Sequence, residues 1–220
     1  MITRRAFTAA VLGLVSSKSN SKGSAPHPVS TGDLMDPNPW TIGPVINGQN
    51  YSVGMPLNPA PHPEGWSFDI PQAPGSVHYV TTPYGSLTRK GALILRYRIE
   101  AGPGVVLHPT RFFGFPSMLS LYFQRQGDDW SARGPFEAFR WYSPLLHSPV
   151  QAGDHELIVP LDANWTAVMT SSAEGNPTGF AAAKEQCSVV GMTWGGGDGR
   201  GHGVSATGLA RFICKSFEVR

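Results

Sequence analysis

The chain has 220 residues, among them 26 glycines and 20 prolines, and only 15% are charged. This composition favours many short strands joined by turns in a single large domain, and it excludes a helical bundle. The formal net charge is +2 with the basic residues scattered along the chain, so the sequence lacks the basic stripe of a nucleic-acid-binding protein and predicts no nucleic-acid partner.

Residues 1–25 have the features of an export signal. Arg4 and Arg5 follow Thr3 and are followed by Phe7, then by an apolar run too short to span a bilayer and by small polar residues. The order resembles a bacterial twin-arginine signal, with ordinary secretion or a frayed N-terminus as alternatives. We therefore expect a periplasmic or extracellular bacterial protein without a membrane span, folded over residues 26–220.

Residues 26–74 carry frequent prolines, which cannot donate to a strand ladder. They are expected to form edge strands or extended coil that wraps a sheet. Alternation of apolar and polar residues predicts half-buried strands, beginning with Trp66, Phe68 and Ile70. The remaining strands predicted in this half and the middle of the chain cover residues 77–81, 93–99, 119–123, 136–144 and 157–161. One short helix is expected over 180–185, packed on a sheet because it is too short to be stable alone.

Two apolar runs near the C-terminus, 187–194 and 207–214, flank a loop with six glycines. We predict that they pair as antiparallel strands on either side of this loop. That register places Cys187 opposite Cys214, and these are the only cysteines in the chain. A disulfide between them is therefore expected, which agrees with export and would contribute roughly 3 to 4 kcal/mol of stability.

The sequence segments GALILRYRIEAG, LYFQR, GDHELIVPLDANWTAVM, CSVVGMTWGGGDGRGHGV and ARFICKSFEV occur in this order, with the short helix before the fourth. Their order resembles the galactose-binding-like jelly-roll domains of bacterial carbohydrate-binding modules, over residues 77–219. The resemblance implies an all-β, antiparallel jelly-roll β-sandwich with one short helix, often with a structural calcium. It also implies a glycan partner, bound on a concave sheet face or on loops at one edge.

Aromatic side chains beside polar ones are what a glycan site requires, because sugars present apolar C–H faces flanked by hydroxyls. Two neighbouring segments, 128–130 and 140–142, supply this mixture, and the polar faces of nearby strands extend it. Alternatively, Trp141 and Tyr142 are ordinary sandwich residues, one facing inward and one outward, and the arginines are solvated. The candidate ligand-binding residues here are Asp128, Asp129, Trp130, Arg140, Trp141, Tyr142, Arg96, Arg98, Tyr122 and Gln124.

The glycine-rich loop adds Trp194, Arg200 and His202 as candidate ligand-binding residues. Its glycines permit close approach of the backbone to a ligand or an ion. Asp198 could bind calcium together with loop carbonyls, although the chain has no EF-hand spacing. A flexible loop without a ligand is the plain alternative.

No nucleophile elbow or zinc-binding histidine spacing occurs in the chain. We therefore expect a carbohydrate-binding protein without covalent chemistry, which uses an aromatic and arginine-bearing surface. The first alternative is a jelly-roll glycan hydrolase or polysaccharide lyase, in which Glu137 with Asp128 or Asp129 would form the carboxyl pair. The second alternative is an exported structural or adhesive protein whose exposed aromatics contact another protein.

Overall fold

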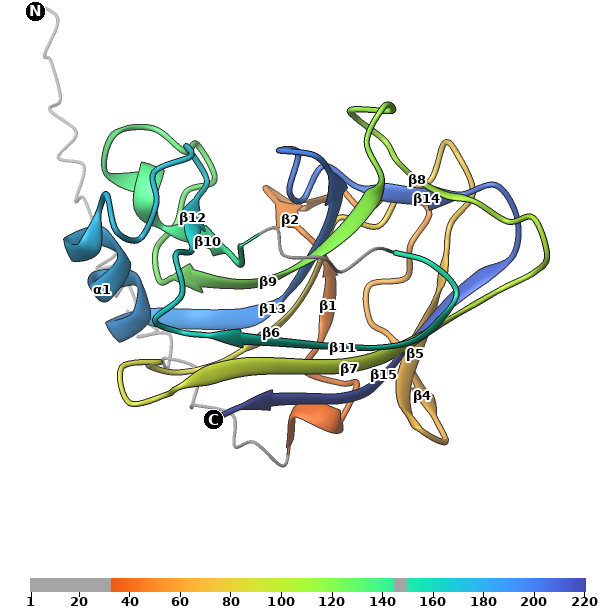
Figure 1. Cartoon of the computed structure of the whole chain (residues 1–220), viewed down its shortest axis with the longest axis horizontal. Helices are drawn as coiled ribbons and strands as arrows, with labels where there is room; N and C mark the ends of the chain where they lie inside the picture. Colours follow the sequence, from red (N-terminus) through yellow and green to blue (C-terminus); the bar gives the residue numbers. More distant parts are fainter. Residues whose placement is uncertain (1–32, 145–149) are drawn as a thin grey trace, which may run out of the picture.

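A computed structural model describes residues 33–144 and 150–220. Two antiparallel sheets pack face to face around one apolar core (Figure 1). The six-stranded sheet contains, in spatial order, β1 (Thr41–Gly43), β6 (Tyr79–Pro83), β13 (Cys187–Gly196), β9 (Ser117–Arg125), β10 (Arg140–Tyr142) and β12 (Thr166–Ala167). The five-stranded sheet contains β11 (Gly153–Pro160), β7 (Ala92–Ala101), β15 (Ala210–Val219), β5 (Gly65–Ile70) and β4 (Ala60–His62). The prediction of an all-β sandwich is confirmed.

Smaller elements complete the described residues. They are the two-stranded pairs β2 (Val45–Ile46) with β3 (Gln49–Asn50) and β8 (Leu107–Pro109) with β14 (Val204–Ala206), the 3₁₀ turns η1 (Asp33–Met35) and η2 (Gly134–Ala138), and the helix α1 (Pro177–Glu185). The proline-rich segment supplies β1 and β4, which are edge strands of the two sheets as expected.

Alternation along the strands builds the core. In β7, Leu93, Leu95, Tyr97 and Ile99 are at most 1% exposed, whereas Arg96 and Arg98 between them are partly exposed. Inward side chains of the two sheets meet directly, because the Trp194 ring of β13 lies 5.1 Å from that of Phe212 in β15. The period of two in the sequence therefore identifies the buried face of each sheet.

The helix α1 begins earlier than expected, at Pro177, after the capping residue Asn176. The Asn176 side chain accepts a hydrogen bond from the Gly179 amide at 3.0 Å. Its buried Phe180 ring lies 4.8 Å from the Trp141 ring of β10, so the helix packs on the end of the six-stranded sheet. Figure 1 shows it at one end of the sandwich, with β8 and β14 towards the other.

The predicted pairing of the two C-terminal strands is wrong, although both strands exist. The strand β13 pairs with β6 and β9, whereas β15 pairs with β5 and β7 in the opposite sheet. Between them, β14 pairs with β8, and the chain crosses from one sheet to the other instead of turning back. Cys187 and Cys214 therefore belong to different sheets, and both are buried free thiols without the predicted disulfide.

The strand predicted over 136–144 is also shorter than expected. Its first part forms η2, in which Pro135 starts a 3₁₀ turn, and only Arg140–Tyr142 join the sheet as β10. No helix among the described residues is long and apolar enough to cross a membrane. The predicted export signal, residues 1–25, lies outside the described residues.

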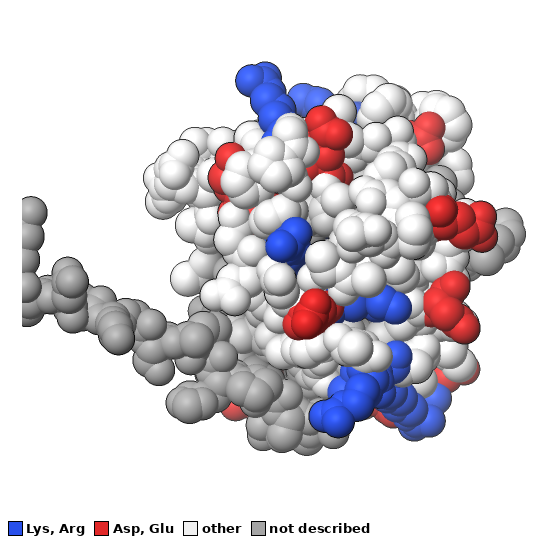
Figure 2. Space-filling model, turned by 90° about the vertical axis from the view of Figure 1, so that its left-hand side faces the viewer, with Lys and Arg blue, Asp and Glu red and all other residues white. Residues whose placement is uncertain are grey.

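Charged side chains are mixed in sign on the side of the molecule that carries α1. Figure 2 shows Lys and Arg interspersed with Asp and Glu there, on a surface that is mostly uncharged. This side therefore presents no stripe of basic residues.

Candidate functional site

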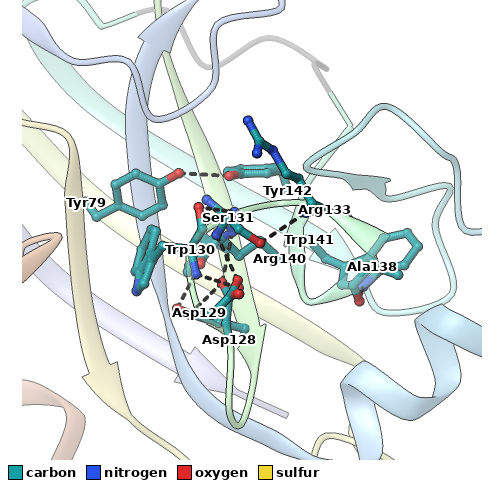
Figure 3. A network of polar contacts seen from close by, with 12 residues as sticks. Tyr79, Asp128, Asp129, Trp130, Ser131, Arg133, Ala138, Arg140, Trp141 and Tyr142 are labelled. Carbon is teal, nitrogen blue, oxygen red and sulfur yellow. Dashed lines mark hydrogen bonds and ion pairs between the residues drawn. The ribbon is translucent and has the colours of Figure 1, made fainter. Parts of the chain in front are cut away.

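Three tyrosines lie side by side on the outer face of the six-stranded sheet. Tyr79 comes from β6, Tyr122 from β9 and Tyr142 from β10, and all three are buried. Tyr122 and Tyr142 are directly paired across their strands. The hydroxyls of Tyr79 and Tyr142 share a hydrogen bond of 2.8 Å, as Figure 3 shows. An outward face that holds buried aromatics must be covered, and the loop after β9 covers this one.

A buried ion pair holds that loop against the sheet. Arg140 Nε lies 2.9 Å from Asp128 Oδ2, with 8% of the Arg140 side chain and none of the Asp128 side chain exposed. Gln124 Nε2 donates to the same carboxylate oxygen at 2.9 Å, and the Trp130 amide donates to Oδ1 at 3.0 Å. Both carboxylate oxygens of Asp128 thus accept hydrogen bonds, which is how a buried charge is tolerated.

Burial and the arginine act on Asp128 in opposite directions. Loss of solvent raises the pKa of Asp128, and the positive charge of Arg140 opposes this by favouring the carboxylate. The net result is a pKa above the usual value of 3.8. Asp129 differs, because it is exposed and a hydrogen bond from the Ser131 hydroxyl holds its pKa below the usual range.

Trp130 projects from the same loop over the tyrosines. Its backbone is left-handed, with φ of 65°, which bulky residues rarely adopt. The Arg140 guanidinium lies 4.8 Å from the centre of the Trp130 ring, and the Tyr79 ring meets it edge-on at 5.4 Å. These contacts hold the half-buried Trp130 in a backbone conformation that costs energy. Such backbone strain is concentrated at ligand sites.

Two hollows adjoin this cluster and share Tyr79. The larger one, which we name the sheet hollow, has a volume of about 300 Å³, and its walls include Trp130, Gln124, Thr41, Thr81 and Ser188. The smaller one, which we name the arginine pocket, has a volume of about 120 Å³. Its walls include Arg140, Tyr142, Asp198, Arg200 and His202. The structure therefore joins the two groups of candidate residues that the sequence places far apart.

The glycine-rich loop reaches the arginine pocket because it lies against Tyr79. Gly201 has a φ of 72°, and a side chain there would collide with the Tyr79 hydroxyl. The Gly201 carbonyl is also 2.9 Å from Nδ1 of His78, and the Gly203 amide donates to Trp194 O at 2.8 Å. These bonds tie the loop to His78, just before β6, and to β13, whereas the alternative of a flexible loop stays untested.

Two predicted ligand-binding tryptophans lie in the core. Trp141 and Trp194 are both 0% exposed. Trp141 packs on Phe180 and donates Nε1 to the Ala138 carbonyl at 2.9 Å. Because Arg140 and Tyr142 face outward, the alternation of the strand turns Trp141 inward. Neither tryptophan can contact a ligand on the outer surface.

Arg96 and Arg98 lie on the outer face of the other sheet, so they do not extend the tyrosine cluster. Arg98 contacts Glu64 at 2.7 Å and Asp154 at 3.0 Å, and Arg96 contacts Glu156 at 2.6 Å. Their charges are already matched by neighbouring carboxylates on a solvent-exposed face. This agrees with the interpretation of them as solvated side chains.

The remaining carboxylates do not assemble into a recognisable centre. Asp198 is exposed, and the described residues hold no group of three or more His, Cys, Asp or Glu side chains that could bind a metal. A calcium ion takes six to eight oxygen ligands, and the calcium site expected at Asp198 with loop carbonyls stays a prediction. Glu137 is exposed on η2, whereas Asp128 is fully engaged by its hydrogen bonds.

Sequence reasoning missed Tyr79 and the loop before β9. Tyr79 touches both hollows, and its outward position follows from the alternation around the buried Val80. In the loop, Phe112, Phe113 and Phe115 are 48%, 76% and 56% exposed. The signal for them was the sequence RFFGF itself, a cluster of phenylalanines around a glycine without strand periodicity.

Comparisons of the chain with protein-family models, curated proteins and solved structures gave no match. The resemblance to galactose-binding-like domains therefore stays a prediction.

Proposed function

We propose that the protein binds a glycan in the sheet hollow, without covalent chemistry. The observation that carries this proposal is the position of Trp130, whose indole forms one wall of a hollow that also presents hydroxyl and amide groups. The other walls include the apolar side chains of Pro44, Val45 and Val189. A flat aromatic wall suits the apolar face of a sugar ring, and the side chains of Thr41, Thr81 and Gln124 suit its hydroxyls. The volume of about 300 Å³ lies at the lower end of the range for ligand pockets.

The site is built before any ligand arrives, which favours binding. The Asp128–Arg140 ion pair and the bond from Gln124 to Asp128 fix the loop that carries Trp130. A ligand therefore does not have to order that loop, and more of its contact energy contributes to affinity. Location outside the cytoplasm remains part of the proposal, but it rests on residues 1–25 alone, because the disulfide that agreed with it does not form.

The variant Trp130→Ala tests this function. In affinity electrophoresis through gels that contain different polysaccharides, we expect the wild type to be retarded by at least one glycan. Trp130→Ala should weaken that retention about tenfold, since it removes the stacking wall. Trp130→Phe, which keeps an aromatic face, should retain part of the effect, and thermal melting should confirm that both variants fold. Equal retention of wild type and Trp130→Ala, or no retention by any glycan, would contradict the proposal.

A second candidate function, contact with another protein, is favoured by the three exposed phenylalanines. Two of the rings lie against the glycine-rich loop, Phe112 near Gly199 and Phe115 near Gly197, and Phe113, between them in the sequence, is the most exposed. Exposed apolar groups gathered in this way are typical of interaction surfaces. Phe113→Ala separates the two functions, because it should leave glycan retention unchanged and reduce only protein contacts. The hydrolase or lyase alternative is tested by release of reducing ends or unsaturated products.

A further inference from the structure

Arg200 is a half-buried side chain that forms no ion pair within the described residues. Its Nε atom is inaccessible to solvent and makes no hydrogen bond. Asp198 attracts it only at longer range, since the two form no ion pair within residues 33–144 and 150–220. Burial lowers the pKa of Arg200, yet an arginine in a protein stays charged. Such a group is costly unless something supplies hydrogen-bond acceptors and negative charge.

The rest of the arginine pocket also holds donors without acceptors, beside the Asp198 carboxylate. Tyr79 and Tyr142 share a single hydrogen bond, so one of their two hydroxyl protons has no acceptor among the described residues. Arg140 Nε lies 2.9 Å from Asp128 in an ion pair but makes no hydrogen bond, and Nη2 donates to the Trp130 carbonyl at 3.2 Å. A ligand that complements these walls must bring acceptor oxygens.

The charged side chains around the pocket also favour an anionic ligand. Arg140 is matched by Asp128, which leaves Arg200 and the exposed Asp198 as the other charged side chains that line the pocket. Arg111 is close enough that its charge adds to burial in lowering the pKa of His78 and His202. The planar guanidinium of an arginine is well suited to bind planar or tetrahedral oxyanions.

We propose that the arginine pocket binds an acidic group of the glycan, a carboxylate or a sulfate ester, with Arg200 as its main contact. This inference rests on the proposed function and names the glycan as an acidic one. The pocket of about 120 Å³ is much smaller than the sheet hollow and suits one substituent. Tyr79 and its neighbour Arg140, which contacts Trp130, place the two hollows next to each other, so one glycan could reach both with a ring beside Trp130 and an acidic group at Arg200.

Titration calorimetry with matched ligands tests the inference. The probes are an oligosaccharide of uronic acids and its methyl ester, and a sulfated oligosaccharide and its desulfated form, so each pair shares one backbone. We expect the wild type to bind at least one acidic form about tenfold more tightly than its neutral partner. The pair that shows the preference identifies carboxylate or sulfate as the group recognised.

Variants connect this preference to the pocket. Arg200→Gln should remove the preference while leaving affinity for the neutral form unchanged, and Arg200→Lys should keep part of it. Arg96→Gln on the opposite sheet is the matched control and should change neither affinity. Equal affinity for acidic and neutral forms, or a preference that survives Arg200→Gln, overturns the inference and leaves the proposed function standing. Binding of no glycan of either kind overturns both.

Discussion

The two outer faces of the sandwich use the same side-chain chemistry in opposite surroundings. On the five-stranded sheet, Arg98 and Asp154 form an ion pair with 30% and 60% of their side chains exposed. On the six-stranded sheet, Arg140 and Asp128 form an ion pair with 8% and 0% exposed. Water solvates the first pair whether or not it forms, so the pair contributes little. Water cannot solvate the buried charges of the second pair, so each charge is stabilised mainly by its partner.

This difference explains why one face is a candidate site and the other is not. On the exposed face, Glu64, Asp154 and Lys215 form further ion pairs with Arg98 or with one another, so its charges are mutually satisfied. On the covered face, the charges are fixed by burial, and the hollows beside them keep unfilled donors. A surface whose groups are already paired offers a ligand little, whereas fixed and unfilled donors offer it much.

Removal of one arginine from each face should give the largest contrast. We expect Arg140→Gln to lower the free energy of unfolding by about 3 to 5 kcal/mol at neutral pH, because it leaves Asp128 buried without its counter-charge. Arg98→Gln should cost less than about 1 kcal/mol, since its partners remain solvated. Urea denaturation monitored by tryptophan fluorescence measures both. Similar losses for the two variants would show that the faces do not differ in this way.

The pH dependence of stability should have opposite signs on the two faces. Burial raises the pKa of Asp128, so the folded protein binds this proton more tightly than the unfolded chain, and stability is lost as the pH rises from 3.8 through the folded value. The hydrogen bond from Arg98 lowers the pKa of Asp154, so its contribution is present above 3.8 and is lost as the pH falls through the folded value.

The variants Asp128→Asn and Asp154→Asn isolate these contributions. The urea midpoint of the wild type minus that of each variant should be followed between about pH 2 and 6, over which carboxyl groups titrate. This difference should fall with rising pH for Asp128 and rise, by a smaller amount, for the exposed Asp154. The same direction for both residues would contradict the assignment of burial as the dominant effect at Asp128.

The smallest effect on stability is expected from adding a reductant, because Cys187 and Cys214 lie in different sheets and form no disulfide. Burial raises the pKa of Cys187 to about 12 and that of Cys214 well above its ordinary value. We expect no thiol alkylation of the native protein, two alkylated thiols after unfolding without reductant, and no change in melting temperature when a reductant is added. Mass spectrometry measures the alkylation. A mass lower by two hydrogens in the absence of reductant would show that the two cysteines form a disulfide and would contradict this prediction.

Local pattern predicted the strands well but not their partners. Alternation located β5, β7, β9 and β11, because side-chain direction repeats every two residues in any half-buried strand. Alternation could not show that Arg96 and Arg98 lie on the five-stranded sheet, because it tells which side chains face outward but not which sheet a strand joins. The two apolar runs on either side of the loop suggested a hairpin, which the opposed cysteines seemed to support. The length of the glycine-rich loop was the better signal, because crossing between two sheets needs more chain than a tight turn.

The candidate site was partly predictable for the same reason. Asp128, Trp130, Arg140 and Tyr142 lie in two segments close in sequence, and one turn brings them together. Arg200 joins them from a distant loop, which only the three-dimensional arrangement shows. The strict alternation that identifies Arg140 and Tyr142 as outward residues also assigns Trp141 to the core, so its burial follows from the sequence.

The segment that carries Arg200 also links the two layers of the protein. It leaves the centre of one sheet at β13 and, after β14, enters the centre of the other at β15. A ligand that pushed this segment outward would have to disturb both layers at once. Recognition here should therefore work by selection among ligands of the right shape, with little adjustment of the protein to a poor fit.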